Sequence, residues 1–245
     1  MSGADDAPRR SVTRTQWVAI TAVVLALVFA GTATVASAAR DDGTSPASRT
    51  PSSESADAGF ARDMAVHHQQ AVEMSFIVRD STDDEEVRRL AYDIANTQAN
   101  QRGMLLGWLD MWGLPKVEAG TEPMAWMHGA GDTEGASGME DMEGMDHGDA
   151  GQGGHEAHDG SLMPGMATKT ELDQLRKARG KAAEVLYLQL MTDHHKGGVS
   201  MAEGCVRLCS DGTEKSLAEG MVAAQQSEMS LMADLLAARG AKARS

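Results

Sequence analysis

The sequence predicts an all-α protein: an antiparallel four-helix bundle built from two duplicated helix pairs. The first observation is an internal repeat, in which residues 60–78 and 187–205 align at a constant offset of 127. The same offset still aligns Gln98 with Gln225 further along the chain, which indicates a duplicated unit and not a chance motif. The second observation is that the apolar residues of both copies recur with the period of a helix packed in a bundle.

Both copies carry the same buried seam, whose members are spaced 4, 3, 4, 3 and 4 residues apart. The two seams are Phe60, Met64, His67, Ala71, Met74 and Val78, and Tyr187, Met191, His194, Gly198, Met201 and Cys205. Each helix therefore presents Met-x-x-His on its buried face, with a second histidine, His68 or His195, directly after the first. The small residue one turn on, Ala71 or Gly198, leaves room at the histidine layer.

Histidines in an apolar seam need partners, because an unsatisfied buried polar group costs roughly 1–3 kcal/mol. Four-helix proteins that hold paired iron use Glu-x-x-His, a pattern that is absent from this sequence. A thioether in place of the carboxylate favours Cu(I), with Ag(I) as its chemical analogue, over iron or manganese. The sequence therefore predicts two thioether–imidazole faces that turn toward each other and share a soft ion. The alternative is that methionine and histidine fill the core, because methionine is a common gap-filler.

The predicted ligands are the methionines and histidines of the two copies: Met64, His67, His68, Met74, Met191, His194, His195 and Met201. Polar residues on the second and fourth helices are interpreted as partners that orient the imidazoles, or alternatively as a solvated flank; they are Gln98, Gln101, Gln225 and Glu228. The only cysteines, Cys205 and Cys209, are interpreted as further soft ligands or redox-sensitive thiols in preference to a disulfide. Their i,i+4 spacing in a helix is poor for a disulfide unless the turn frays, and this turn is at a helix end.

The N-terminal part predicts export. Residues 1–16 contain arginines and are predicted to be cytoplasmic, and the uncharged run 17–39 is long enough to cross a bilayer of about 30 Å. A signal peptide cleaved after Ala38 is the competing interpretation. Residues 40–56 are predicted to be a flexible tether. The functional part is thus expected outside the cytoplasm, anchored in the cell membrane or secreted.

The net charge of −14 argues against nucleic acid as a partner. Residues 117–167 contain twelve glycines, eleven acidic residues and no lysine or arginine, which predicts a disordered linker between the helix pairs 57–116 and 168–240. Its methionines and histidines are typical of weak, exchangeable soft-metal sites, unless they reflect compositional drift. They are Met124, Met127, His128, Met139, Met142, Met145, His147, Met163 and Met166.

Local signals place the helices. A capping box is expected where Ser81 and Thr82 precede two acidic residues, and a second one where Thr168 precedes Glu171. Five helices are predicted, and the second runs from the box at Ser81 and Thr82 to about residue 113. The other four span residues 57–79, 168–178, 181–209 and 213–239.

The repeated Met-x-x-His-His-x-x-x-Val-x-Met pattern resembles the bacterial family known as domain of unknown function family 305. The MPGM stretch at 163–166, ahead of YLQLMTDHHKGGVSMA, resembles it as well. The resemblance covers about residues 57–240 without most of the linker. It implies a ferritin-like bundle, copper binding in the cell envelope as in some members, and the eight methionines and histidines above as binding positions, with Met163 and Met166 as additions.

The expected function is Cu(I) binding for sequestration, resistance or delivery, with copper ions and a copper-transfer protein as partners. Catalysis is not expected, because the sequence offers no nucleophile–base pair, phosphate-binding loop or carboxylate dyad. The alternatives are a ferritin-like redox enzyme such as a cuprous oxidase, and a metal-free helical interaction module whose methionines scavenge oxidants.

Overall fold

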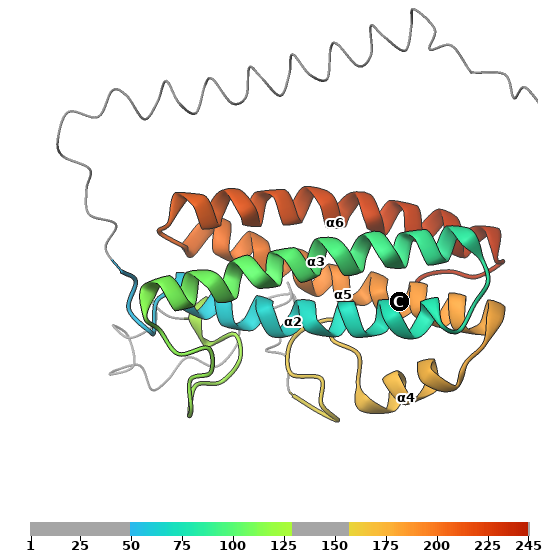
Figure 1. Ribbon diagram of the computed structural model, residues 1–245, viewed down its shortest axis with the longest axis horizontal. Coiled ribbons are helices and arrows are strands. Elements are labelled where there is room, and N and C mark those ends of the chain that lie inside the picture. The colour runs from blue at the N-terminus through green and yellow to red at the C-terminus, as the bar shows by residue number, and fades with distance from the viewer. Residues whose placement is uncertain (1–49, 129–156, 245) are drawn as a thin grey trace, which may run out of the picture. The chain divides into compact units, whose positions relative to one another are not determined.

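The computed structural model describes residues 50–128 and 157–244, and within these ranges the chain is helical and contains no β-strand. This confirms the predicted all-α class. The predicted capping box of Thr168 and Glu171 is present at the start of the short helix. The helices are α2 (Ala56–Arg79), α3 (Glu85–Trp112), the 3-10 helix η1 (Ala125–Met127), α4 (Lys169–Lys177), α5 (Gly180–Leu208) and α6 (Gly212–Ala238) (Figure 1).

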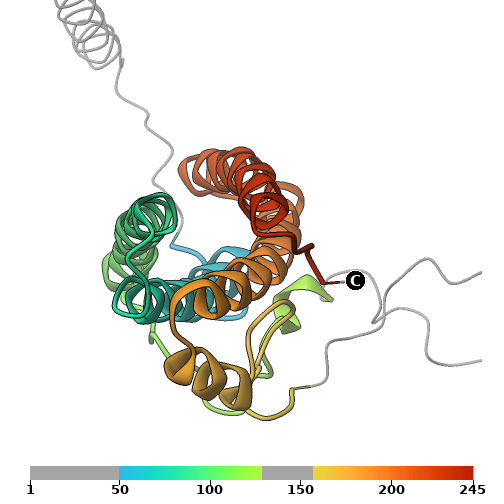
Figure 2. The ribbon, with the colours of Figure 1, turned by 90° about the vertical axis from the view of Figure 1, so that its right-hand side faces the viewer.

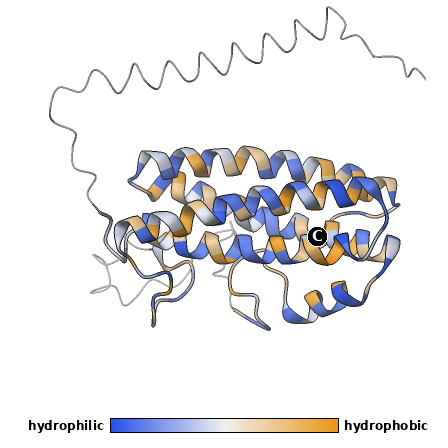
Figure 3. Cartoon of the chain, in the orientation of Figure 1, coloured by the Kyte–Doolittle hydropathy of each residue, from blue (hydrophilic) through white to orange (hydrophobic). Residues whose placement is uncertain are grey.

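The four long helices stand in the spatial order α3, α2, α5, α6. α2 packs against α3, α5 against α6, and the central helices α2 and α5 against each other. Seen along the helices, the four form an arc with α3 and α6 at its ends, while α4 lies on the other side of the central pair (Figure 2). α2 and α5 run antiparallel (Figure 1). The central helices α2 and α5 are therefore covered on two faces. The side of α3 that faces the viewer in Figure 3 carries many hydrophilic residues.

The start of α3 differs from the prediction. The capping residue is Asp84, whose carboxylate accepts a hydrogen bond from the Val87 N–H at 3.0 Å, and not Ser81 or Thr82. The Thr82 hydroxyl donates instead to the Glu184 carboxylate of α5 at 2.6 Å. That contact joins residues far apart in sequence, so a local pattern could not show it.

The first end of the predicted linker is folded onto α2. Trp126 of η1 is 6% exposed and packs edge-on against Phe60, with ring centroids 5.8 Å apart. Its indole N–H donates to Asp63 at 2.9 Å. Gly59 makes this approach feasible, because a Cβ there would lie 2.5 Å from the tryptophan side chain. One aromatic residue thus anchors a segment whose composition predicts disorder.

The second end of that linker is also ordered, because residues 163–167 pack on the central helices. The prediction of a single disordered linker over 117–167 is therefore wrong for 117–128 and for 157–167. The part between them lies outside the described residues.

The predicted cytoplasmic segment 1–16, the anchor or signal segment 17–39 and most of the tether 40–56 also lie outside the described residues. Among the helices of 50–128 and 157–244, none has the length and apolar character needed to cross a membrane.

Candidate metal centre

The histidine layer lies where the central helices face each other. His67 of α2 and His194 of α5 stack with ring centroids 3.8 Å apart and planes inclined by 34°. Both side chains are buried, at 0% and 1% exposure. They are equivalent residues of the two repeats and lie on antiparallel helices. Their contact therefore lies at the approximate twofold axis that relates the repeats.

Backbone acceptors set the proton position on both rings. The Nε2 of His67 lies 3.2 Å from the carbonyl oxygen of Pro164, and the Nε2 of His194 lies 3.0 Å from that of His67. A carbonyl only accepts, so each Nε2 carries the proton and each neutral ring keeps its lone pair on Nδ1. Neither Nδ1 has a hydrogen-bond partner among the described residues.

The second histidine of each repeat has the same arrangement on the side of α3 and α6. The Nε2 of His68 lies 2.9 Å from Gln101 Oε1, and the Nε2 of His195 lies 2.7 Å from Glu228 Oε2. Both Nδ1 atoms are again buried without a partner within the described ranges. An oxygen acceptor on one ring nitrogen, with the other nitrogen free, is the usual state of a metal-binding histidine.

Burial keeps the imidazoles of His67, His68 and His194 neutral. Desolvation lowers the pKa of His67 to about 4 and that of His68 to about 3. The pKa of His194 lies well below its ordinary value, first because of burial and then because of the neighbouring histidines. A histidine binds a metal through its neutral ring, and these three rings keep a free lone pair in mildly acidic surroundings.

Acidification is expected to destabilise the metal-free protein between about pH 6.5 and pH 4. In this window the unfolded chain takes up a proton at His67 and the folded chain does not, because the folded pKa is about 4 against 6.5. Stability then falls with falling pH, by up to about 1.4 kcal/mol per pH unit for each such imidazole. Urea unfolding of the apoprotein at pH 7 and pH 5 measures this effect.

The His68→Gln variant isolates one imidazole and should flatten the pH dependence. The raised pKa of Glu214, about 9, acts in the opposite sense, because its stabilisation is lost as the pH rises from 4.5 through 9. The difference between wild type and variant cancels this contribution. Replacement of the exposed His128 should leave the curve unchanged. An unaltered curve for His68→Gln would show that His68 is not held neutral by the fold.

The four methionines predicted as ligands on the two repeated helices are fully buried, but they divide between two apolar clusters. Met64 and Met201 belong to one apolar cluster, and Met74 and Met191 to another. On antiparallel helices, equivalent positions lie opposite each other only at the twofold axis. The methionine before the histidine on one helix therefore lies near the methionine after the histidine on the other helix. The expectation that the two Met-x-x-His faces share one ion therefore needs revision, because Met64 and Met191 lie in different clusters.

The MPGM segment covers the histidine layer. Met163 is 1% exposed and joins the cluster of Met64 and Met201, and Met166 packs partly buried against it. The neighbouring Pro164 supplies the carbonyl that binds His67. These residues thus lie next to the histidine layer.

Two residues that position this segment were not singled out from the sequence. The amide of Gln70 pairs with the backbone of Ala167, accepting its N–H at 2.6 Å and donating to its carbonyl at 2.9 Å. At the equivalent position of the second repeat stands Gly197, where a Cβ would lie 1.9 Å from the Pro164 carbonyl oxygen. The sequence repeat could have indicated these two positions, because Gln70 aligns with Gly197 and the two residues differ in size and polarity.

The remaining predicted residues are dispersed. Gln98 and Gln225 are buried, and the Gln225 amide fills the space that the absent side chain of Gly198 leaves. Met124 and Met127 pack partly buried against the cluster of Met64, whereas His128 is exposed. The others, Met139, Met142, Met145 and His147, lie outside the described residues.

The cysteines correct a prediction. Cys205 and Cys209 form a disulfide, with Cα atoms 4.8 Å apart, and are not free ligands or thiols in this structure. α5 ends at Leu208, and Cys209 has an extended backbone with φ −63° and ψ 150°. The end of the helix thus releases the second cysteine from the helical geometry that disfavours an i,i+4 bridge.

Histidine nitrogens alone do not complete a metal site. Among the described residues, three His, Cys, Asp or Glu ligand atoms come within 4.8 Å of one another only at Cys205, Cys209 and Glu214. A cation at the histidine layer would therefore need methionine sulfur in addition to imidazole.

Comparisons with known proteins show the family of this chain. Residues 57–236 match the family described as domain of unknown function (DUF305), and no curated protein sequence matches the chain. A Streptomyces coelicolor DUF305 protein assigned as secreted is 58% identical, with a TM-score of 0.64 over 79% of this chain and 99% of that one. A DUF305 fragment from Deinococcus radiodurans is 23% identical, with a TM-score of 0.53 over 74% of this chain and 94% of that one. The Cu(I)-bound form of CopM is 18% identical, with a TM-score of 0.48 over 72% and 91%. The family match spans most of the chain, and this protein belongs to the DUF305 family.

Proposed function

We propose that this chain binds Cu(I), with Ag(I) as a chemical analogue, outside the cytoplasm, and that it sequesters or delivers the metal without catalysing a reaction. The observation that carries the proposal is the set of four buried imidazole Nδ1 atoms without hydrogen-bond partners in the described chain. Each belongs to a ring whose other nitrogen is already held by an oxygen, so the lone pair on Nδ1 is available to a metal ion.

The donor set favours a soft monovalent ion. Neutral imidazoles and thioethers bring no negative charge, and thioethers select Cu(I) over iron, manganese or magnesium. The stacked His67 and His194 lie between the pair Met64 and Met201 and the pair formed by Met74 and Met191. In our proposal each thioether pair, together with the adjoining imidazoles, offers a set of ligands drawn from both repeats.

Location outside the cytoplasm is supported by the similar Streptomyces coelicolor protein that is assigned as secreted. The apolar run of residues 17–39 supports it as well, either as a membrane anchor or as a signal peptide. In such a compartment the protein would pass copper to a partner protein or retain it. The Met- and His-rich part of the linker would add weaker sites for capture.

Replacing His67 and His194 together by alanine is expected to weaken Cu(I) binding by at least about tenfold, because even outer partners of a metal site contribute 10- to 100-fold. Competition with a chromophoric Cu(I) chelator under anaerobic conditions measures the affinity. Circular dichroism of the apoprotein checks that the helices remain.

The matched control is His128→Ala, which removes an exposed histidine and should leave the tightest site intact. Unchanged affinity in the double variant would place tight binding outside the histidine layer and would overturn the proposal. Loss of affinity in the control alone would have the same meaning.

A further inference from the structure

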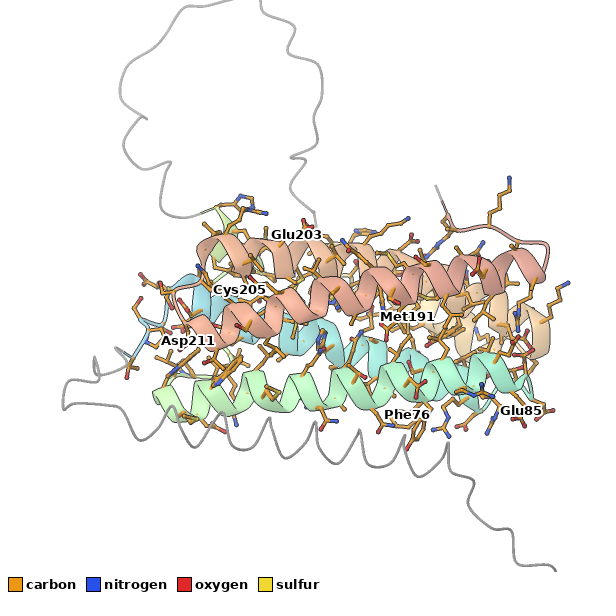
Figure 4. The ribbon with its side chains drawn as sticks, turned by 90° about the horizontal axis from the view of Figure 1, so that it is seen from above. Phe76, Glu85, Met191, Glu203, Cys205 and Asp211 are labelled. Atoms are coloured by element: carbon orange, nitrogen blue, oxygen red, sulfur yellow. A yellow bond between two sulfur atoms is a disulfide. The ribbon has the colours of Figure 1, made fainter. Side chains whose placement is uncertain are left out.

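A second cluster of ligand atoms lies at the end of the bundle where α5 passes into α6. Figure 4 shows Cys205 and Asp211 at this end of the helices. One sulfur each from Cys205 and Cys209 and one carboxylate oxygen of Glu214 lie within 4.8 Å of one another. We propose that reduction of the disulfide turns this cluster into a dithiolate–carboxylate site for a divalent cation of the Zn(II) class. The proposal does not depend on copper binding at the histidine layer.

The first repeat shows which side chains suffice for packing at the positions of Cys205 and Glu214. At the offset of 127, Cys205 aligns with Val78 and Glu214 aligns with Val87. Both valines are fully buried at the other end of the bundle. Apolar side chains therefore suffice to build this corner, and the second repeat has replaced them by a thiol and a carboxyl group. A carboxyl group in place of a buried valine costs free energy unless it finds a partner.

The neighbour that Glu214 finds is a second acidic group, Asp57. The side chain is 0% exposed, and neither carboxylate oxygen receives a hydrogen bond from any described residue. Burial, and then the charges of Asp57 and Asp211, raise the pKa of Glu214 to about 9. The Asp57 carboxylate, in turn, accepts the backbone N–H groups of Ser210 and Asp211 at 2.8 and 2.7 Å. Two acidic groups are thus buried side by side.

This end of the bundle also lacks a positive charge next to its two acidic groups. At the opposite end of the bundle, Glu184, which aligns with Asp57, forms an ion pair with Arg239 at 2.6 Å. The residue that aligns with Arg239 in the first repeat is Trp112, so the end with the cysteines lacks the equivalent guanidinium. Within 50–128 and 157–244, neither Asp57 nor Glu214 has an ion pair. A bound cation would supply this charge.

The chemistry balances with a dithiol as reductant. Two electrons and two protons convert the bond between Cys205 and Cys209 into two thiols, and the dithiol becomes a disulfide. A divalent cation then displaces the two thiol protons and the proton of Glu214. Two thiolates and a carboxylate carry three negative charges, so a 2+ ion compensates them better than Cu(I) does. Cysteine sulfur and carboxylate oxygen are both ligands that Zn(II) accepts. In the oxidised state the sulfurs are bonded to each other and the site is closed.

The test uses the purified chain in oxidised form and after reduction by a phosphine, with thiols counted by alkylation. Zn(II) competition with a chromophoric chelator should show that the reduced chain takes up an additional Zn(II). Substitution by Co(II) should give a thiolate charge-transfer absorption only in the reduced chain, which separates this cluster from sites made of histidine and methionine.

The variants identify the ligands. Glu214→Gln should weaken the additional Zn(II) by at least about tenfold, and the double change of Cys205 and Cys209 to serine should remove the Co(II) absorption. Glu219→Gln, an exposed position on the same helix, is the matched control and should bind as the wild type does. The proposal is overturned if reduction adds no Zn(II), if Glu214→Gln binds as tightly as Glu219→Gln, or if the folded chain resists reduction. None of these outcomes bears on copper at the histidine layer.

Discussion

Leucine in place of Met64, Met74, Met191 and Met201 together is expected to reduce Cu(I) affinity by about a hundredfold or more while the fold persists. The thioethers complete the proposed site, because the histidine layer alone offers too few ligand atoms close together. Loss of direct ligands should cost at least as much as the 10- to 100-fold of outer partners. Leucine and methionine have similar volumes, so each exchange costs less than about 1.5 kcal/mol. Anaerobic Cu(I) competition and urea unfolding measure the two effects separately.

The pairing of the methionines makes this prediction sharper. The double change of Met64 and Met201 removes one cluster's thioethers, and the double change of Met74 and Met191 removes those of the other. If each pair holds its own ion, each double variant loses part of the stoichiometry and keeps the rest. Exchanging the exposed Met111 for leucine controls for methionine number. Quadruple-variant affinity equal to that of wild type would rule out thioether ligation.

Alanine in place of Gly197 is expected to displace the MPGM segment. The added Cβ would lie 1.9 Å from the carbonyl oxygen of Pro164 and 2.6 Å from its carbon, and both are backbone atoms that cannot rotate away. We expect a loss of roughly 1–3 kcal/mol in the free energy of unfolding from overpacking. The hydrogen bond from His67 to Pro164 should weaken as well. Urea unfolding measures the first effect, and the imidazole signals of His67 in an NMR spectrum report the second.

Gly220→Ala is the matched control, because Gly220 also lies inside a long helix but has no atom within 4 Å of the added Cβ. Alanine there should stabilise the protein by about 0.5–1 kcal/mol, since glycine is unfavourable inside a helix. Equal effects of the two substitutions would show that the segment does not press on Gly197. The opposite signs expected here make the comparison insensitive to general helix propensity.

Much of the helical framework could be predicted from sequence because the signals are local. The repeat and the spacing of apolar residues located the helices to within a few residues, and the box of Thr168 and Glu171 is present. The cap of α3 was missed because the Thr82 hydroxyl binds Glu184, which is distant in sequence. The anchoring of Trp126 was missed for a similar reason, because composition averages over a segment and one aromatic side chain can fix it.

In the candidate site, too, local patterns were informative, whereas contacts between distant residues were not visible in the sequence. The seam pattern indicated Gln101 and Glu228 as candidate partners of the imidazoles, and the structure pairs them with His68 and His195. The pairing of methionines across the two repeats depends on the antiparallel packing of α2 and α5, which an alignment of the copies does not contain. The positions where the copies disagree were the overlooked signal. Gln70 against Gly197, and Val87 against Glu214, mark places where the second half has departed from the first.

The twofold relation between the repeats also bears on how the molecule holds together. Each helix hairpin contributes one imidazole to the stacked pair and one sulfur to each thioether pair. Neither hairpin by itself contains the whole set of proposed ligands. An ion bound between them would therefore cross-link the two hairpins, and the metal-bound protein would be more stable against unfolding than the metal-free one.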